Sequence, residues 1–486
     1  AITVSAGSLK LNEAGTLASS VSMKRGTFLD ADESMIISGS LTQSGSFSTD
    51  QGWTIDVAVG KTLTYTGAAI GIEGHKLILT SSSSNGGATF NNTNPLLLNN
   101  ANSYLRFDAE VTVGSVSVNV AGNSGRGLKI NQSSTIGSLT VTANTELSIY
   151  SGKSLSGAIT LATGSLKLNK TGTLASSVSM SGGTILDVDD TLTISGTLTQ
   201  SGAIEIDVKA GEVLTYSGAA LSLGANTLTL KGGGTFSNTN ALVLNDADSL
   251  LSLAGILTIG DVDGTAASNT GKGIKVTSSA TLGDYDLSAE SYLDIAEDKT
   301  LAGQLNLQSN GELNISGSGE YTGDIALAGG KFSAVDDQEL SGTLSVTADS
   351  ELSVASGYIL ELSQDGGLSL GANTLTLSGG GNLESGGLTL NDADSKLLLN
   401  SITVDSVSTS AASLGLDVDA DSTVTSLTVG HLATPVSIAD GITLSGGIAV
   451  TGGSIKLGEA GTLGSTVTMS GGTILDVDDT LTISGT

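Results

Sequence analysis

The sequence predicts an all-β protein built as a parallel β-helix, or β-solenoid, and repetition, alternation and turn spacing support that prediction. The stretch SGGTILDVDDTLTISGT occupies residues 181–197 and returns unchanged at 470–486, and weaker copies begin at Lys24 and Ala328. Inside the stretch, apolar and polar residues alternate with the period of a strand that has one buried face. Glycines and acidic pairs interrupt the alternation where turns are needed. Tandem strand-and-turn units are typical of solenoids.

Repeats occur at two length scales. The long scale is marked by four equivalent glycines, separated by 157, 147 and 142 residues: Gly26, Gly183, Gly330 and Gly472. We predict three large repeats and the opening of a fourth in one continuous solenoid: 2–158, 159–304, 305–447 and 448–486. Within each, glycine-bearing turns followed by short apolar-polar-apolar runs predict coils of about 21 residues. Because Asn-Gly and Asp-Gly hairpin turns are scarce, like strands are expected to stack in parallel rather than form a sandwich.

Charge and composition narrow the choice of partners. The chain has 19 Lys and Arg against 48 Asp and Glu, a net charge of −29, and Arg occurs only at Arg25, Arg106 and Arg126. No basic patch is expected, so nucleic acid and anionic membrane surfaces are excluded as partners. No apolar run of about 18 residues is present, so this segment is not expected to insert into a membrane. With no Cys and only 3% aromatic residues, the core is expected to be aliphatic.

The sequence does not predict an enzyme. Parallel β-helices include enzymes that cleave acidic polysaccharides with Arg, Lys and metal-binding Asp clustered on one face. Here no Arg lies in a repeated motif, and an acidic surface would repel such substrates. His75 and His431 stand alone, without a nearby nucleophile motif. We therefore assign no catalytic residue.

One acidic stretch is a candidate calcium site. Asp417, Asp419 and Asp421 give DVDADS the D-x-D-x-D opening of a calcium loop, although the following Gly and the later Glu are missing. A turn without metal is the alternative, because LNDADS at Leu244 appears as LNNANS at Leu98. Both Asp and Asn suit turns. Calcium is thus the one cofactor that the sequence suggests.

The lone tryptophan is a candidate binding residue. The first large repeat is ten residues longer than the second between the marker glycines, and the excess lies at 51–53 and 81–85. These segments are expected to protrude from one side of the solenoid. Trp53 would then be an exposed contact residue, and the alternative is an aromatic ring that covers the edge of the core.

The repeats SGGTILDVDDTLTISGTLTQSG and LSLGANTLTLSGGG resemble the passenger and stalk repeats of bacterial autotransporter and filamentous-haemagglutinin-type adhesins. This resemblance implies a right-handed parallel β-helix, export to the cell surface, and a role as a rod, adhesin or extracellular fibre. The leading hypothesis is a structural segment of an extracellular fibre. The alternative is an adhesin that binds a receptor or glycan through lateral loops.

The two ends of the sequence suggest self-association. Residues 448–486 align with 2–40, and neither end shows a polar cap. An uncapped solenoid exposes strand edges that accept a further strand. We therefore expect either continuation in a longer array or stacking of copies head to tail, which generates open filaments.

Overall fold

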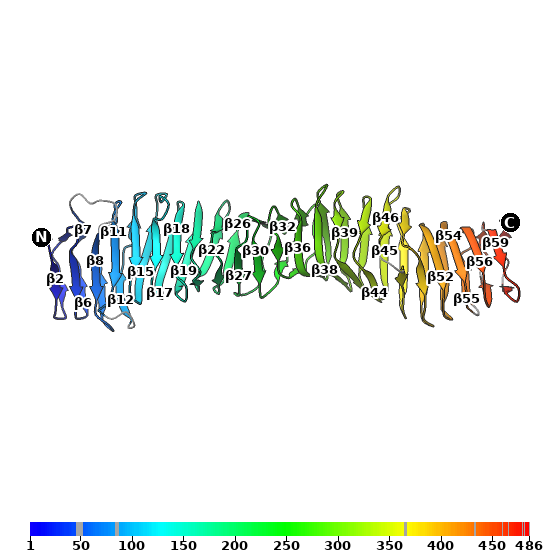
Figure 1. Ribbon diagram of the computed structural model, residues 1–486, viewed down its shortest axis with the longest axis horizontal. Helices are drawn as coiled ribbons and strands as arrows, with labels where there is room; N and C mark the ends of the chain where they lie inside the picture. Colours follow the sequence, from blue (N-terminus) through cyan, green and yellow to red (C-terminus); the bar gives the residue numbers. More distant parts are fainter. Residues whose placement is uncertain are drawn as a thin grey trace. The chain divides into compact units, whose positions relative to one another are not determined.

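The computed structural model describes the following residues: 1–44, 52–82, 87–363, 367–431, 434–458, 460–464, 466–478, 480 and 482–485. These residues form 61 short β-strands, and no helix occurs among them (Figure 1). The predicted all-β class is therefore confirmed. Within the described ranges, no helix is long and apolar enough to cross a membrane.

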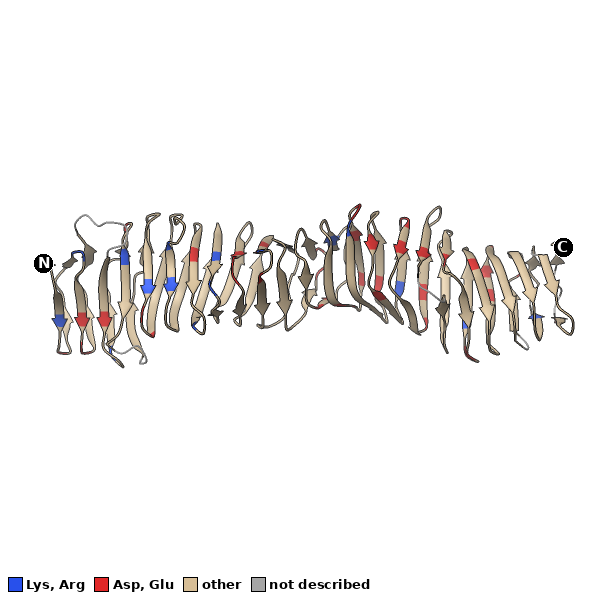
Figure 2. Ribbon diagram, in the orientation of Figure 1, with Lys and Arg blue, Asp and Glu red and all other residues tan. Residues whose placement is uncertain are grey.

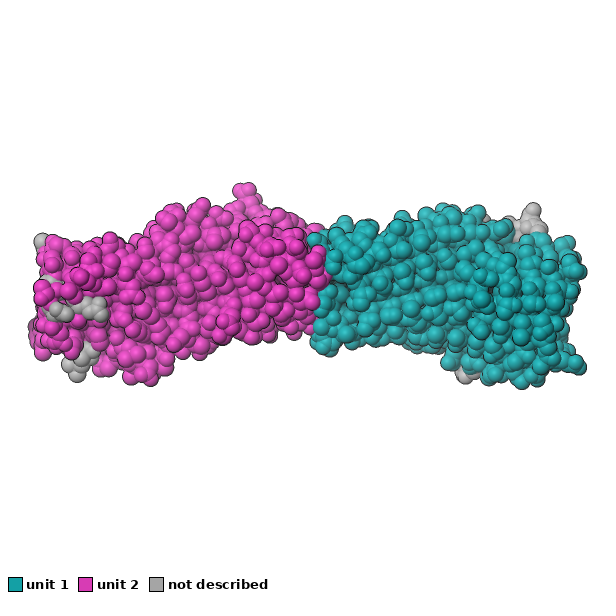
Figure 3. Space-filling view, turned by 180° about the vertical axis from the view of Figure 1, so that it is seen from behind, with its two compact units in different colours: residues 1–222, 226–240 teal, residues 223–225, 241–486 magenta. Residues whose placement is uncertain are grey.

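The chain divides into two compact units. Residues 1–222 with 226–240 form unit 1, and residues 223–225 with 241–486 form unit 2 (Figure 3). The division falls inside the second predicted large repeat. The boundaries of the large repeats remain a prediction from the sequence.

Each turn contributes one strand to a long set of strands that pair side by side. In unit 1 its strands are β2 (Ser8–Leu11), β5 (Phe28–Ala31), β8 (Gly52–Val57), β11 (Lys76–Thr80), β14 (Tyr104–Phe107), β16 (Gly127–Ile130), β18 (Thr145–Ile149), β20 (Ser165–Asn169), β23 (Ile185–Val188), β26 (Ile204–Val208) and β29 (Thr227–Lys231). In unit 2 they are β32 (Leu250–Leu253), β35 (Gly273–Val276), β37 (Glu290–Ile295), β39 (Glu312–Ser316), β42 (Lys331–Ala334), β45 (Ser350–Val354), β48 (Thr374–Ser378), β51 (Lys396–Asn400), β53 (Gly415–Ala420), β55 (Thr434–Ile438), β57 (Ser454–Leu457) and β60 (Ile474–Val477). We call this set the main ladder.

Pairing in the main ladder is parallel from one turn to the next. Ser165 of β20 pairs with Ile185 of β23, and Ile185 pairs with Glu205 of β26, so these turns take 20 residues each. The strands between them pair in the same way, as β22 (Ser177–Ser181) does with β25 (Leu198–Ser201). Each described unit is thus a stack of turns, and the predicted parallel β-solenoid is confirmed.

The stacking follows from the alternation in the sequence. Leu166, Leu186 and Ile206 occupy one row of the main ladder and are fully buried. The residues between them, such as Asp187, point outward and are half-buried. Because equivalent residues of successive turns lie directly above one another, the inward apolar residues form a continuous row in the core.

The core is less purely aliphatic than the composition suggests. The largest fully buried side chains include Trp53, Tyr65, Tyr216, Phe90 and Phe236. Tyr65 stacks on Phe90 with ring centroids 6.4 Å apart, and Tyr216 stacks on Phe236 at 6.3 Å. Each of these Tyr hydroxyls is satisfied, and that of Tyr216 donates to the Ala219 carbonyl and accepts from the Leu198 amide. The expectation of an aliphatic core was therefore wrong in part, because aromatic rings can be buried when their polar atoms are paired.

Glycine is required where turns approach closely at a corner. A Cβ atom at Gly196 would lie 1.9 Å from the Ser176 carbonyl oxygen of the preceding turn. At Gly39, the equivalent residue of the first copy, it would lie 2.2 Å from the Ser19 carbonyl oxygen. The Ser-Gly end of the repeated stretch is therefore set by backbone contact between turns.

Candidate functional site

The acidic turns that suggested metal binding are closed by their own side chains. In LNDADS, the Asp246 carboxylate accepts a hydrogen bond from the Asp248 amide at 3.0 Å. Asp392 does the same for Asp394 at 3.1 Å, and Asn100 holds the equivalent turn in LNNANS at 3.0 Å. An amide oxygen performs this task as well as a carboxylate does. These positions therefore need a side-chain acceptor rather than a charge.

The candidate calcium residues lie on a strand and beyond its end rather than in one loop. Asp417 belongs to β53, is half-buried, and forms an ion pair of 2.5 Å with Lys396 of β51. Asp419 is exposed, and Asp421 accepts a hydrogen bond from the Thr443 amide at 2.8 Å. Within the described residues, no group of three or more His, Asp or Glu is arranged to hold a metal ion. The residues do not fit the predicted loop, and calcium binding stays an untested prediction.

Trp53 is a core residue. It lies in β8, and its side chain is only 1% exposed. The interpretation of Trp53 as an exposed contact residue was therefore wrong, and the alternative of a ring that covers the core holds. Of the segments where lateral protrusions were predicted, Gln51 and residues 83–85 lie outside the described residues.

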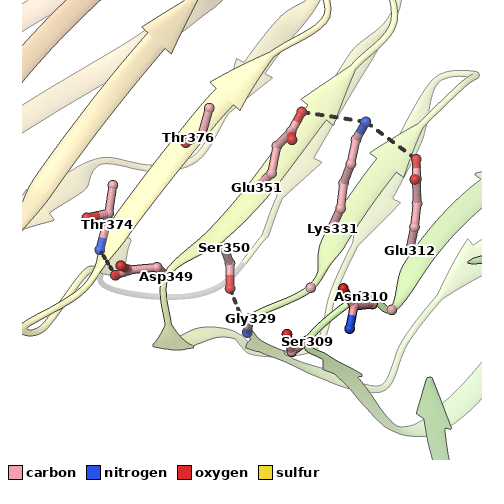
Figure 4. A pocket seen from close by; sticks show the side chains of 12 residues that line it. Ser309, Asn310, Glu312, Gly329, Lys331, Asp349, Ser350, Glu351, Thr374 and Thr376 are labelled. Carbon is pink, nitrogen blue, oxygen red and sulfur yellow. Dashed lines mark hydrogen bonds and ion pairs between the residues drawn. The ribbon is translucent and has the colours of Figure 1, made fainter. Parts of the chain in front are cut away.

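A polar groove of about 490 Å³ lies over the outer face of the main ladder in unit 2 (Figure 4). Lys331 of β42 stands between two carboxylates, 3.4 Å from Glu312 and 3.5 Å from Glu351 (Figure 4). Asp349 accepts a hydrogen bond from the Thr374 amide at 2.7 Å. These groups pair with one another across successive turns, so the arrangement ties the turns together.

The same cross-turn pairing occurs in the repeated stretch. Lys167 of β20 lies 3.8 Å from Asp187 and 2.6 Å from Asp189. Its counterpart Lys10 pairs with Asp30 at 3.2 Å. Burial raises the pKa of Asp187 above its ordinary value, and Lys167 opposes that rise. The outer face of the ladder thus places carboxylates close together and offsets part of their repulsion with a lysine.

Unit 1 contains a local excess of positive charge that the sequence reasoning missed. Residues 101–170 hold six basic and three acidic side chains: Arg106, Arg126, Lys129, Lys153, Lys167 and Lys170 against Asp108, Glu110 and Glu146. Figure 2 shows ribbon positions of Lys and Arg, in blue, on neighbouring strands of this unit. The prediction of no basic patch did not consider this local excess, and carboxylates of Glu146, Asp189 and Asp190 lie among the same cations. The available signal was the spacing of cations and tyrosines by one coil, as in Arg106 to Lys129 and Lys129 to Tyr150.

Four of the six cations line a groove of about 400 Å³, here named the basic groove. Its lining residues are Tyr104, Ser124, Gly125, Arg126, Leu128, Lys129, Glu146, Ser148, Tyr150, Lys167, Asn169, Lys170, Asp189 and Asp190. The groove crosses β14, β16, β18 and β20 of the main ladder. Arg126 lies over the Tyr104 ring, with Cζ 5.9 Å from the centroid. Lys129 lies over the Tyr150 ring, with Nζ 4.9 Å from the centroid. Cation–π contacts of this kind hold both cations in place.

Comparison of this chain with protein-family models, with curated proteins and with solved structures gave no match. The class of the protein is therefore defined by its fold. It is a repeat protein of the parallel β-solenoid type, and cations and aromatic rings meet in the basic groove.

Proposed function

We propose that this chain is a structural segment of an extracellular fibre or rod on a microbial surface. The observation that supports the proposal is the parallel pairing of successive described turns inside each unit, which stacks buried apolar residues into rows. The stability of such a stack is approximately the sum of the contributions of single turns and of the contacts between neighbouring turns. Further turns can therefore be added with the same contacts.

The outer surface suits a fibre that must stay soluble. Outward positions of the main ladder carry Asp, Glu, Lys, Ser and Thr, and the net charge is −29. A large net charge of one sign opposes lateral aggregation. Export to the cell surface is part of the proposal and is supported by the resemblance of the repeats to adhesin stalks.

Self-association end to end also belongs to this proposal. A strand that pairs in parallel with the next turn presents backbone N–H and C=O groups that a further strand can meet. Contacts between unlike ends of identical subunits produce open filaments. The partner proposed here is therefore a further copy or a further array of the same turns.

Negative-stain electron microscopy of the purified chain tests the proposal. Fibres of uniform width that lengthen with protein concentration are expected. Short particles that carry a distal head would contradict the fibre role and favour the adhesin alternative. Immunogold labelling of thin sections of the source cells tests the location separately, and label confined to the cell interior would contradict the extracellular location.

A further inference from the structure

Two aspartates lie opposite each other on neighbouring turns of unit 2, outside the main ladder. Asp263 of β34 (Val262–Gly264) pairs in parallel register with Asp286 of β36 (Ala280–Leu287). Both side chains are half-buried and alternate with fully buried neighbours, so both point to the outer face. Like charges directly opposite each other on neighbouring strands weaken the pairing of those strands. We call this pair of strands the acidic step.

The equivalent positions in the other two large repeats are uncharged. They carry hydroxyl side chains that pair in the same register: Ser117 with Thr140 in the first repeat, and Ser408 with Thr428 in the third. The chain therefore contains two neutral versions of the acidic step in the same fold. These versions provide matched controls for the effect of the two carboxylates.

The strand that carries Asp263 is also interrupted. In the first repeat one strand, β15 (Val111–Val118), spans the equivalent part of the turn without a break. In the second repeat this part is divided into β33 (Thr258–Ile259) and β34, with the turn at Asp261 between them. The Asp284 amide donates a hydrogen bond of 3.0 Å to the Asp261 carboxylate there. Fewer paired residues therefore hold the acidic step than hold its neutral version in the first repeat.

The charge of the acidic step has no compensating lysine in the part of the chain that the structure describes. Other stacked aspartates, such as Asp187 and Asp56, have a neighbouring lysine that opposes the rise of their pKa. Burial raises the pKa of Asp263, and the carboxylates of Asp286 and Asp261 raise it further, with no cation to oppose them. The repulsion in the acidic step is thus left without a counter-charge.

Within the described ranges, the other groups that face this pair are neutral or acidic. Val243 of the preceding turn pairs with Asp263. Asn306 of the following turn pairs with Asp286 and donates a hydrogen bond of 2.6 Å to its carboxylate. Asp284 lies two residues before Asp286 on β36 and is exposed. Proton uptake by either of the opposed carboxylates therefore removes one charge of the pair and relieves the repulsion between the two strands.

From this geometry we propose that the acidic step is a pH-sensitive contact of the solenoid, which opens locally at neutral pH and closes as the pH falls. Local opening is expected where few paired residues and uncompensated charge coincide, because different parts of a fold open at different free energies. At a pH above the raised pKa of Asp263 this carboxylate is charged and the step is weakened. As the pH falls through that pKa, the closed step binds the proton more tightly than the open step does and is stabilised. This device goes beyond the fibre role and does not depend on it.

Hydrogen–deuterium exchange of the full chain, measured by mass spectrometry at about pH 4 and about pH 7, tests the proposal. After correction for the intrinsic effect of pH on exchange, residues 280–287 are expected to exchange about threefold faster at neutral pH than at acidic pH. Residues 134–141, which belong to the neutral version in the first repeat, are expected to show no such change. A variant with both Asp263→Ser and Asp286→Thr carries the side chains of that neutral version, so its pH effect is expected to disappear.

Three outcomes would overturn the proposal. The first is equal corrected exchange of residues 280–287 at the two pH values, and the second is a pH effect of the same size in residues 134–141. The third is a pH effect that survives in the double variant, since the two aspartates would then not be its cause. If the double variant does not fold as judged by circular dichroism, Asp286→Asn keeps the size of the side chain and replaces it. The pH effect should be lost in Asp286→Asn too, and an undiminished effect would overturn the proposal.

Discussion

At the scale of single residues, outward carboxylates in the main ladder oppose folding at neutral pH. Asp187 stacks between Lys167 and Asp207, and burial is the largest cause that raises its pKa. Asp56 of β8 has a raised pKa for the same first cause, and so has Asp263, which lies outside the main ladder. A raised pKa means that the folded state binds the proton more tightly than the unfolded chain does.

We therefore expect the chain to become more stable as the pH falls from neutral toward the ordinary Asp value of 3.8. At a pH above the raised pKa, the buried carboxylates are charged and lower the free energy of unfolding by their full amount. As the pH falls through the raised pKa, the carboxylates take up protons and this loss of stability is relieved. Urea unfolding at several pH values measures how the free energy of unfolding changes with pH. Asp187→Asn should reduce this dependence of stability on pH. Stability that rises from acidic to neutral pH would contradict this expectation.

The acidic turns make a second prediction at this scale. Asp246→Asn should change stability by no more than about 0.5 kcal/mol, because Asn100 closes the equivalent turn in the first repeat. Asp246→Ala removes the acceptor for the Asp248 amide and should cost about 1 kcal/mol. Amide hydrogen exchange over residues 244–253 reports the local effect. Equal protection in the Ala and Asn variants would show that the side-chain acceptor is not needed.

At the scale of elements, the corner glycines set how closely two turns approach. Gly196→Ala places a Cβ atom 1.9 Å from the Ser176 carbonyl oxygen, and backbone must move to relieve it. A loss of about 1–3 kcal/mol is expected from such overpacking. Gly87→Ala is the control, since nothing lies within 4 Å of its added Cβ. Thermal unfolding followed by circular dichroism compares the two variants. An equal unfolding midpoint would contradict the close approach of the two turns at Gly196.

At the scale of the whole molecule, calcium is the remaining question about cofactors. Asp417 and Asp421 are each engaged by another group, so we expect no structural role for calcium. The midpoint of thermal unfolding should be the same with a chelator and with added calcium. A midpoint that rises with calcium would restore the metal as a ligand of the fold, and Asp419→Asn would then test whether DVDADS binds it.

Much of the fold could be predicted because its information is local and repeated. Alternation in residues such as Leu186 and Val188 assigns the buried face, and recurrence in register assigns parallel pairing, since each turn meets a near copy of itself. The right hand of the helix and the extracellular location remain predictions. The placement of Trp53 failed because its alternation with Ile55 and Val57, which are buried on the same side of β8, was not used.

The sequence by itself determined the solenoid, its coil length and its aliphatic rows. Alternation gives each strand one apolar face, and stacking of tandem repeats buries these faces together. Only the tertiary structure decided which side chains meet across turns. Arg126 and Tyr104, or Lys129 and Tyr150, are 21 or 22 residues apart in sequence, and stacking alone brings each cation over its ring. The tertiary structure also showed that the Asp residues of DVDADS do not point to a common metal site, because Asp417 and Asp421 interact with residues of other turns.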